Sequence, residues 1–207
     1  MKTSMSLARL FGAALLIAAV VAAPSAQVGK SQGVADINTM SEASVAALPG
    51  LNATIAKALV AKRPFASITE LNAFLVGQGL TPEQAAAVYA KAFVQINLNT
   101  ATVDEIMLVP GAGRRMAREF PEYRPWKTYA QFDKEIGKYV GPEATAKLAQ
   151  YTFIPLNANT AADADLLTVP GADQAWADKV KKGRPYKTAA DLEKVAGKAQ
   201  ARFFVIE

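Results

Sequence analysis

The feature that most constrains the fold of this chain is an internal repeat with a period of about 60 residues. Three kinds of landmark, an Asn-Thr pair, a Pro-Gly pair and an Arg-Pro-aromatic triplet, each recur after 61 and then 60 residues. They stand at Asn38-Thr39, Asn99-Thr100 and Asn159-Thr160, at Pro49-Gly50, Pro110-Gly111 and Pro170-Gly171, and at Arg63-Pro64-Phe65, Arg124-Pro125-Trp126 and Arg184-Pro185-Tyr186. Because independent landmarks keep one spacing over both intervals, we predict a tandem array.

The repeat divides the chain into three predicted domains, which we call units one, two and three. Unit one covers residues 34–95, unit two residues 96–155 and unit three residues 156–207. With 207 residues, of which 51% are apolar, the chain is long and apolar enough for two or three small folded domains.

The first 27 residues have the pattern of a signal peptide. Lys2 and Arg9 flank an N-terminal segment, and residues 10–23 are an unbroken run of apolar and small residues. As a helix this run of 14 residues would rise about 21 Å, short of the roughly 30 Å of a bilayer core. We therefore predict export to a periplasmic or secreted location, with no stable membrane span after cleavage. An uncleaved N-terminal anchor is the alternative and would leave the domains in the same compartment.

Local signals within unit two are helical. Thr102 and Glu105 form a capping-box pattern, and the apolar run that follows is stopped by Pro110-Gly111. A second helix is expected from Arg114, and Pro121 is predicted to end or kink it early because proline lacks the N–H that bonds back.

The rest of each unit repeats a helix, turn and helix more loosely. The aromatic residues of the triplets, Phe65, Trp126 and Tyr186, are predicted to be buried anchors. Unit three ends ten residues after Gly197, so its closing helix is expected to be short. The predicted fold class is all-α.

The chain contains no cysteine and no histidine. Zinc sites of the usual kind, a Ser-His-Asp triad and a Cys-His pair are therefore excluded. Asp and Glu residues occur singly along helix-like segments, which is typical of solvated faces. We expect a protein that is not an enzyme and that uses no cofactor and no metal.

The turn of unit two has a composition suited to phosphate binding. Gly111 and Gly113 permit positive φ and carry no Cβ that would keep a phosphate away. The N–H groups that open the next helix would face the anion, and Arg114 and Arg115 add charge. From the residues alone, a tight interhelical turn beside solvated arginines is an equally good interpretation.

The segment INLNTATVDEIMLVPGAGRRMA, with YRPWKTYAQF after it, resembles the tandem helix-hairpin-helix domain of ComEA-type competence proteins, the exported DNA receptors of natural transformation. This resemblance implies compact SAM-like units with two helix-hairpin-helix motifs each. It also implies that the hairpin binds the sugar-phosphate backbone of double-stranded DNA without reading its sequence. Carried over, the hairpin glycines fall on Gly111 and Gly113, the basic position on Arg115 and the small packing position on Ala117. The candidate DNA-binding residues are Gly111, Ala112, Gly113, Arg114, Arg115 and Arg118.

Units one and three depart from this pattern. Asn52 and Asp173 replace the second glycine, and Thr54 and Ala175 replace the basic residue. We expect Asn and Asp to preserve the turns by adopting left-handed φ. An Asp173 carboxylate about 4 Å from a phosphate would cost on the order of several kcal/mol. Unit three also has a group of cations that could form a separate basic surface, namely Lys179, Lys181, Lys182, Arg184 and Lys187.

The charge balance limits the strength of DNA binding. From residue 28 onward the units carry 5 Lys and Arg against 4 Asp and Glu, 8 against 7, and 8 against 7. Each unit is thus near +1, so affinity for DNA is expected to be modest and salt dependent.

The sequence is consistent with two functional hypotheses. The first is an exported DNA-binding protein in DNA uptake, with other envelope or uptake proteins as further partners. The alternative is an extracytoplasmic helical-repeat scaffold for protein–protein interaction that has lost DNA binding.

Overall fold

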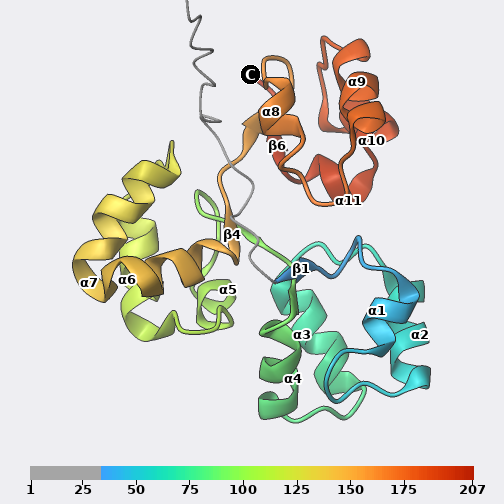
Figure 1. Cartoon of the computed structure of the whole chain (residues 1–207), viewed down its shortest axis with the longest axis vertical. Helices are drawn as coiled ribbons and strands as arrows, with labels where there is room; N and C mark the ends of the chain where they lie inside the picture. Colours follow the sequence, from blue (N-terminus) through green and yellow to red (C-terminus); the bar gives the residue numbers. More distant parts are fainter. Residues whose placement is uncertain (1–33) are drawn as a thin grey trace, which may run out of the picture.

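The computed structural model describes residues 34–207, so the predicted signal peptide at residues 1–27 lies outside the described part of the chain. The fold is mostly helical, which confirms the all-α prediction at that level (Figure 1). Within the described residues, no helix has the length and apolar character needed to cross a membrane.

The same order of elements recurs in the three units. Unit one contains β1 (Ala35–Asp36), α1 (Glu42–Ala46), α2 (Ala53–Lys62), α3 (Ile68–Gly77), α4 (Pro82–Tyr89) and β2 (Ala92–Phe93). Unit two contains β3 (Ile96–Asn97), α5 (Val103–Met107), α6 (Gly113–Glu122), α7 (Tyr129–Ala149) and β4 (Thr152–Phe153). Unit three contains β5 (Leu156–Asn157), α8 (Asp163–Leu166), α9 (Gln174–Lys182), α10 (Ala189–Ala196), α11 (Lys198–Ala201) and β6 (Phe204–Val205). Non-helical backbone at Gly141 divides α7 into two helices, which match α3 and α4 of unit one.

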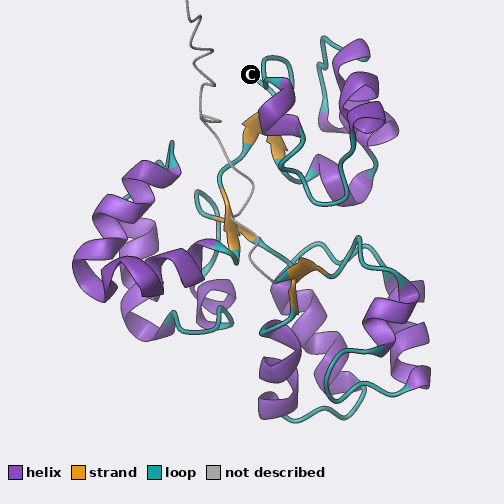
Figure 2. Ribbon diagram, in the orientation of Figure 1, coloured by secondary structure: helices purple, strands orange, loops and turns teal. Residues whose placement is uncertain are grey.

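A pair of short parallel strands closes each unit. The first strand of the unit pairs with its last strand, in the registers Ala35↔Ala92, Ile96↔Thr152 and Leu156↔Phe204. These pairs hold the two ends of each unit together (Figure 2). They were not predicted, because two residues are too few to give an alternating pattern.

The landmark asparagine of each unit is a structural clamp. In unit two, Asn99 Nδ2 donates to the Trp126 carbonyl at 3.0 Å, and Asn99 Oδ1 accepts from the Trp126 N–H at 2.6 Å. Asn38 makes the same two bonds with Phe65, and Asn159 makes them with Tyr186. The clamp therefore satisfies both backbone polar groups of a buried residue, which is otherwise costly.

The landmark arginines are also structural. The Arg124 side chain donates to the carbonyls of Leu98 at 2.8 Å and Ala101 at 2.5 Å. Arg184 bonds to the matching carbonyls of unit three, and Arg63 donates to the Met40 carbonyl. Burial lowers the pKa of the Arg63 and Arg124 guanidinium groups. These arginines hold the interior of their units, so they are not DNA-binding surface cations.

The predicted burial of the landmark aromatic residues is confirmed. Phe65, Trp126 and Tyr186 are each at most 3% exposed. Trp126 Nε1 also donates to the Phe120 carbonyl at 2.8 Å, and the Tyr186 hydroxyl donates to the Val180 carbonyl at 2.6 Å. Their rings anchor the two halves of each unit together and are not available to stack on bases.

Apolar packing joins units one and two. A single cluster of buried residues extends through both units, and the rings of Phe93 and Tyr151 lie 5.0 Å apart, edge to face. Unit three has a second cluster, which begins at Phe153 next to Phe203.

An ion pair joins unit three to unit one. Arg202 Nη2 lies 2.6 Å from Asp36 Oδ2, and Arg202 Nη1 donates to the Gln95 carbonyl at 2.8 Å. By strand register, Asp36 matches asparagines in the other units, at Asn97 and Asn157. The same registers match Arg202 with Ala90 and Gln150, so both charges of the pair are specific to the units that they join.

Two expectations about helix ends have different outcomes. Pro121 does not end α6 early, since α6 extends to Glu122 and α9, which lacks the proline, ends at the matching Lys182. Pro121 costs α6 one backbone hydrogen bond, because its nitrogen carries no N–H, and the helix ends one residue later. The short closing helix of unit three is confirmed as α11, with 4 residues.

Replacing Asn99 with alanine is expected to destabilise the protein by about 2–6 kcal/mol. The substitution leaves the Trp126 N–H and carbonyl unpaired, at about 1–3 kcal/mol for each group. Urea unfolding followed by tryptophan fluorescence measures the change. Thr100→Ala, at the exposed neighbouring position, is the control and should stay within about 0.5 kcal/mol. A loss in Asn99→Ala no larger than in the control would contradict the clamp.

Replacing Asp36 with asparagine should loosen unit three without unfolding unit one. An asparagine retains the oxygen that accepts from the Asn38 N–H but loses the charge that pairs with Arg202. Breaking a buried pair costs about 3–5 kcal/mol, and the partial exposure of Arg202 reduces this to about 2–4 kcal/mol. Faster amide hydrogen exchange in α10, α11 and β6 should follow, with no such change in the surface variant Glu143→Gln. Unchanged exchange in unit three would contradict the role of the pair.

Candidate nucleic-acid interface

The candidate site is the turn between α5 and α6 together with the first residue of α6, residues 108–113, which is called hairpin two below. Gly111 has φ 84° and Gly113 has φ 61°, so the predicted positive φ is confirmed at both positions. A Cβ at either glycine would meet nothing within 4 Å, and both residues are exposed. The glycines are therefore required by backbone conformation, and the space beside them is free for a ligand.

The six predicted site residues are not equivalent. Arg114, Arg115 and Arg118 are exposed on α6, and none of them forms an ion pair within the part of the chain that is described. Ala112 is buried, and its N–H donates to the Val109 carbonyl at 3.0 Å. Ala112 therefore forms the turn and has neither a side chain nor an N–H to offer a phosphate.

The helix that begins at hairpin two has no side-chain cap. In unit one, Asn52 Oδ1 accepts from the Ile55 N–H at 2.9 Å, and in unit three Asp173 Oδ1 accepts from the Trp176 N–H at 2.7 Å. Both capping residues stand where unit two has Gly113. In each counterpart the capping side chain bonds one N–H, at the position of Met116, and the first turn of α6 lacks that acceptor.

The prediction of left-handed φ at Asn52 and Asp173 is wrong. Their φ values are −100° and −127°, and no residue other than glycine has positive φ in the described chain. The extended conformation is the one that a capping residue adopts, and the hydrogen bond to the helix favours it.

Arg115 is positioned by an aromatic surface on α7. Its guanidinium lies 5.5 Å from the centroid of the Tyr139 ring, and the Tyr139 and Tyr123 hydroxyls are 2.7 Å apart. The hydrogen bond with Tyr123 raises the pKa of the Tyr139 hydroxyl. A cation held against a ring has fewer conformations to lose when it binds a phosphate.

Hairpin two also borders unit one. A groove of ≈ 510 Å³ lies between them, with Pro82, Ala86 and Tyr89 of α4 on one side and Met107, Pro110 and the hairpin glycines on the other. The Tyr89 hydroxyl donates to Asn72 Oδ1 at 2.8 Å, and burial raises the pKa of Tyr89 to about 12. The proximity of α4 to hairpin two was not predicted, because contacts between units leave no local pattern in the sequence.

The predicted basic surface of unit three is only partly present. Lys181 pairs with Asp163 at 2.7 Å and with Asp178 at 3.3 Å, and the first of these interactions raises the Lys181 pKa. Arg184 turns inward to backbone carbonyls. The remaining lysines, Lys179, Lys182 and Lys187, are exposed.

Comparison of the chain with protein-family models, with curated proteins and with solved structures gives no match. Among residues 34–207, no group of three or more Asp and Glu side chains is arranged to hold a metal ion.

Alanine at Gly111 or Gly113 should destabilise the protein by about 1–2 kcal/mol each, because a Cβ disfavours left-handed φ. Gly77→Ala is the matched control, since Gly77 lies in α3 without positive φ and its Cβ would also meet nothing. It should be neutral or stabilising by up to about 1 kcal/mol. Thermal unfolding measures all three, and equal effects would contradict the conformational requirement.

Proposed function

We propose that this chain is an exported, non-catalytic protein that binds the sugar-phosphate backbone of double-stranded DNA without sequence specificity. In this proposal units one to three are helix-hairpin-helix domains of the ComEA type, and hairpin two is the main binding site. The protein would act outside the cytoplasm, in DNA uptake across the envelope, together with other envelope or uptake proteins.

The observation that carries the proposal is the uncapped start of α6 beside three exposed arginines. Free N–H groups at a helix start attract an anion, and the helix dipole adds to the attraction. Gly113 has no side chain to occupy that place, whereas Asn52 and Asp173 fill it in the other units. Arg114 and Arg115 directly follow the turn, so one phosphate at the amides would also be within reach of guanidinium groups.

The expected affinity for DNA is limited, because only one hairpin is proposed to bind phosphate. It would neutralise about two or three phosphates, which gives a slope of roughly −2 to −3 for log K against log salt. Non-specific affinities at physiological salt are on the order of 10⁻⁴ to 10⁻⁶ M, and one small site belongs at the weak end of that range.

The alternative is a helical-repeat scaffold for protein–protein interaction. It is favoured by the capped hairpins of units one and three and by the use of Arg63, Arg124 and Arg184 inside the units. A scaffold would keep the fold and show no salt-dependent binding of DNA.

The double variant Arg114→Glu/Arg115→Glu should lose at least tenfold in affinity for a short fluorescent duplex, because two favourable charges become two repulsive ones. Fluorescence anisotropy of the mature protein, over a series of salt concentrations, measures this. Lys179→Glu/Lys182→Glu changes the net charge equally in unit three and is the control. Equal losses in both variants, or no salt-dependent binding by the unaltered protein, would reject hairpin two as the site.

A further inference from the structure

The groove between hairpin two and α4 is continuous with the proposed phosphate site. Gly111 and Gly113 line the groove, and Gly113 also opens α6, where the proposed function places a DNA phosphate. The volume of the groove, ≈ 510 Å³, lies within the range of small-molecule sites. A chemical group joined to a phosphate at hairpin two therefore has this groove beside it.

The matching places in units one and three are covered by side chains. A Cβ at Gly50, the counterpart of Gly111 in unit one, would lie 3.7 Å from the Gln84 side chain. A Cβ at Gly171 of unit three would lie 3.3 Å from the Thr39 side chain of unit one. A Cβ at Gly111 would meet nothing within 4 Å. Of these three matching glycines, the one in hairpin two has open space beside it.

The lining of the groove is uncharged. Pro82 and Ala86 of α4 lie on one side of it, Met107 and Pro110 lie on the other, and none of the described residues that line it is acidic or basic. Met107 is 44% exposed although its side chain is apolar, and a thioether makes favourable contacts with flat ring systems. The groove therefore suits a neutral ring system that is attached to an anion.

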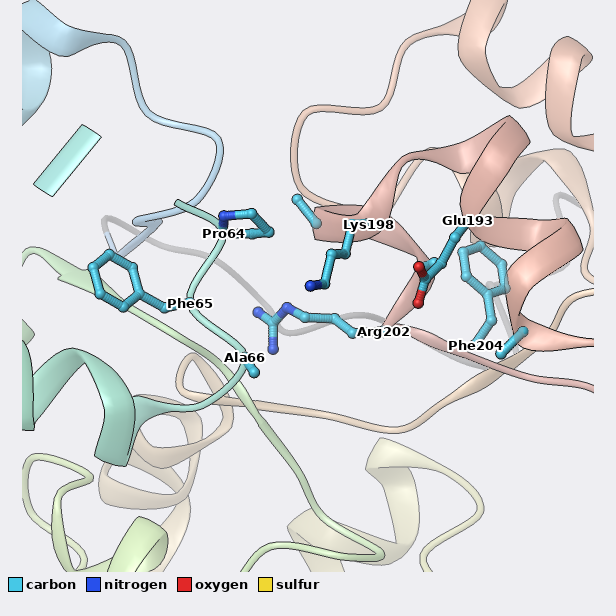
Figure 3. Close-up of a pocket in the computed structure, with 10 residues that line it drawn as sticks. Pro64, Phe65, Ala66, Glu193, Lys198, Arg202 and Phe204 are labelled. Carbon is cyan, nitrogen blue, oxygen red and sulfur yellow. The ribbon is translucent and has the colours of Figure 1, made fainter. Parts of the chain in front are cut away.

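The cavity between units one and three differs in this respect. Its lining includes three charged side chains, those of Glu193, Lys198 and Arg202 (Figure 3). Asp36 and the Gln95 carbonyl hold the two terminal nitrogens of Arg202. A neutral ring in this cavity would take water from charged groups without replacing their hydrogen bonds, which costs free energy. The groove at hairpin two is the better place for such a ring.

Asn72 of α3 supplies an oriented hydrogen-bond donor at the groove. Its Oδ1 accepts from the hydroxyl of Tyr89, which is 3% exposed, at 2.8 Å. Because the oxygen is held there, Nδ2 is left as a donor, and within the described chain it has no hydrogen-bond partner. All four DNA bases carry acceptor atoms on their edges, so one amide donor can serve any of them.

We propose that this groove binds one unpaired nucleobase, so that hairpin two prefers duplex DNA with a single-stranded overhang to blunt duplex. The inference rests on the proposed function, because a phosphate at hairpin two positions the base. The base lies between Pro82 and Met107 and accepts a hydrogen bond from Asn72 Nδ2. A base in an overhang has no pairing partner to lose, so it enters the groove at a lower cost than a base extruded from a duplex.

Fluorescence anisotropy of the mature protein at low salt tests the proposal with three forms of one duplex. One form is blunt, one has a three-nucleotide thymine overhang, and one has an abasic overhang with the same phosphates; both overhang polarities are measured. In at least one polarity the thymine form should bind at least about fivefold more tightly than the abasic form, the lower end of what one stacked base contributes.

The outcomes separate this inference from the proposed function. Salt-dependent binding of the blunt duplex with equal affinity for the thymine and abasic forms overturns the groove and leaves the proposed function standing. No binding of any of the three forms rejects the proposed function and this inference with it.

Matched variants locate the base. Ala86→Leu fills part of the groove from the exposed face of α4 and should bring the ratio of thymine to abasic affinity toward one, with blunt-duplex binding unchanged. Ala87→Leu, at an exposed position of α4 outside the groove, is the control and should keep the ratio. Asn72→Asp retains an acceptor for the Tyr89 hydroxyl but removes the donor, so it should also lower the ratio. A ratio unchanged in Ala86→Leu, or lowered equally in Ala87→Leu, overturns the proposed site.

Discussion

The rest of each unit depends on the two hydrogen bonds between a landmark asparagine and the backbone of a buried aromatic residue. In unit two, Asn99 joins the segment after β3 to Trp126, 27 residues further on. Arg124 fastens the same segment through backbone carbonyls, and the β3–β4 pair closes the unit. The residues that make the repeat visible in the sequence are therefore those that hold the fold.

Functional differences must then lie where the copies differ. A capping asparagine in unit one and a capping aspartate in unit three stand at the position of Gly113. The matching helix start is therefore capped by a side chain in two units and uncapped in unit two. The ion pair of Asp36 and Arg202 is a second difference between copies, and it joins unit three to unit one. One variation leaves a helix start without a side-chain cap, and the other joins units one and three through an ion pair.

Local sequence patterns predicted the local structure well. The capping box at Thr102, the burial of Trp126 and the positive φ of Gly111 and Gly113 each depend on a few neighbouring residues, and all are confirmed. The left-handed φ predicted for Asn52 is wrong because helix caps and left-handed turns favour the same residue types. The two-residue strands and the contacts between units depend on residues far apart in the chain, so no local pattern could predict them.

DNA binding at hairpin two is tested most directly by following backbone amide chemical shifts by NMR while duplex DNA is added to the mature protein at low salt. The amides of residues 113–116 at the start of α6 are expected to shift together as the DNA concentration rises. The matching amides of Ile55 and Trp176 should remain unchanged, because they already donate to the side chains of Asn52 and Asp173. Shifts at Ile55 and Trp176 equal to that at Met116, or no shift at residues 113–116, would contradict the claim that hairpin two alone binds the DNA backbone.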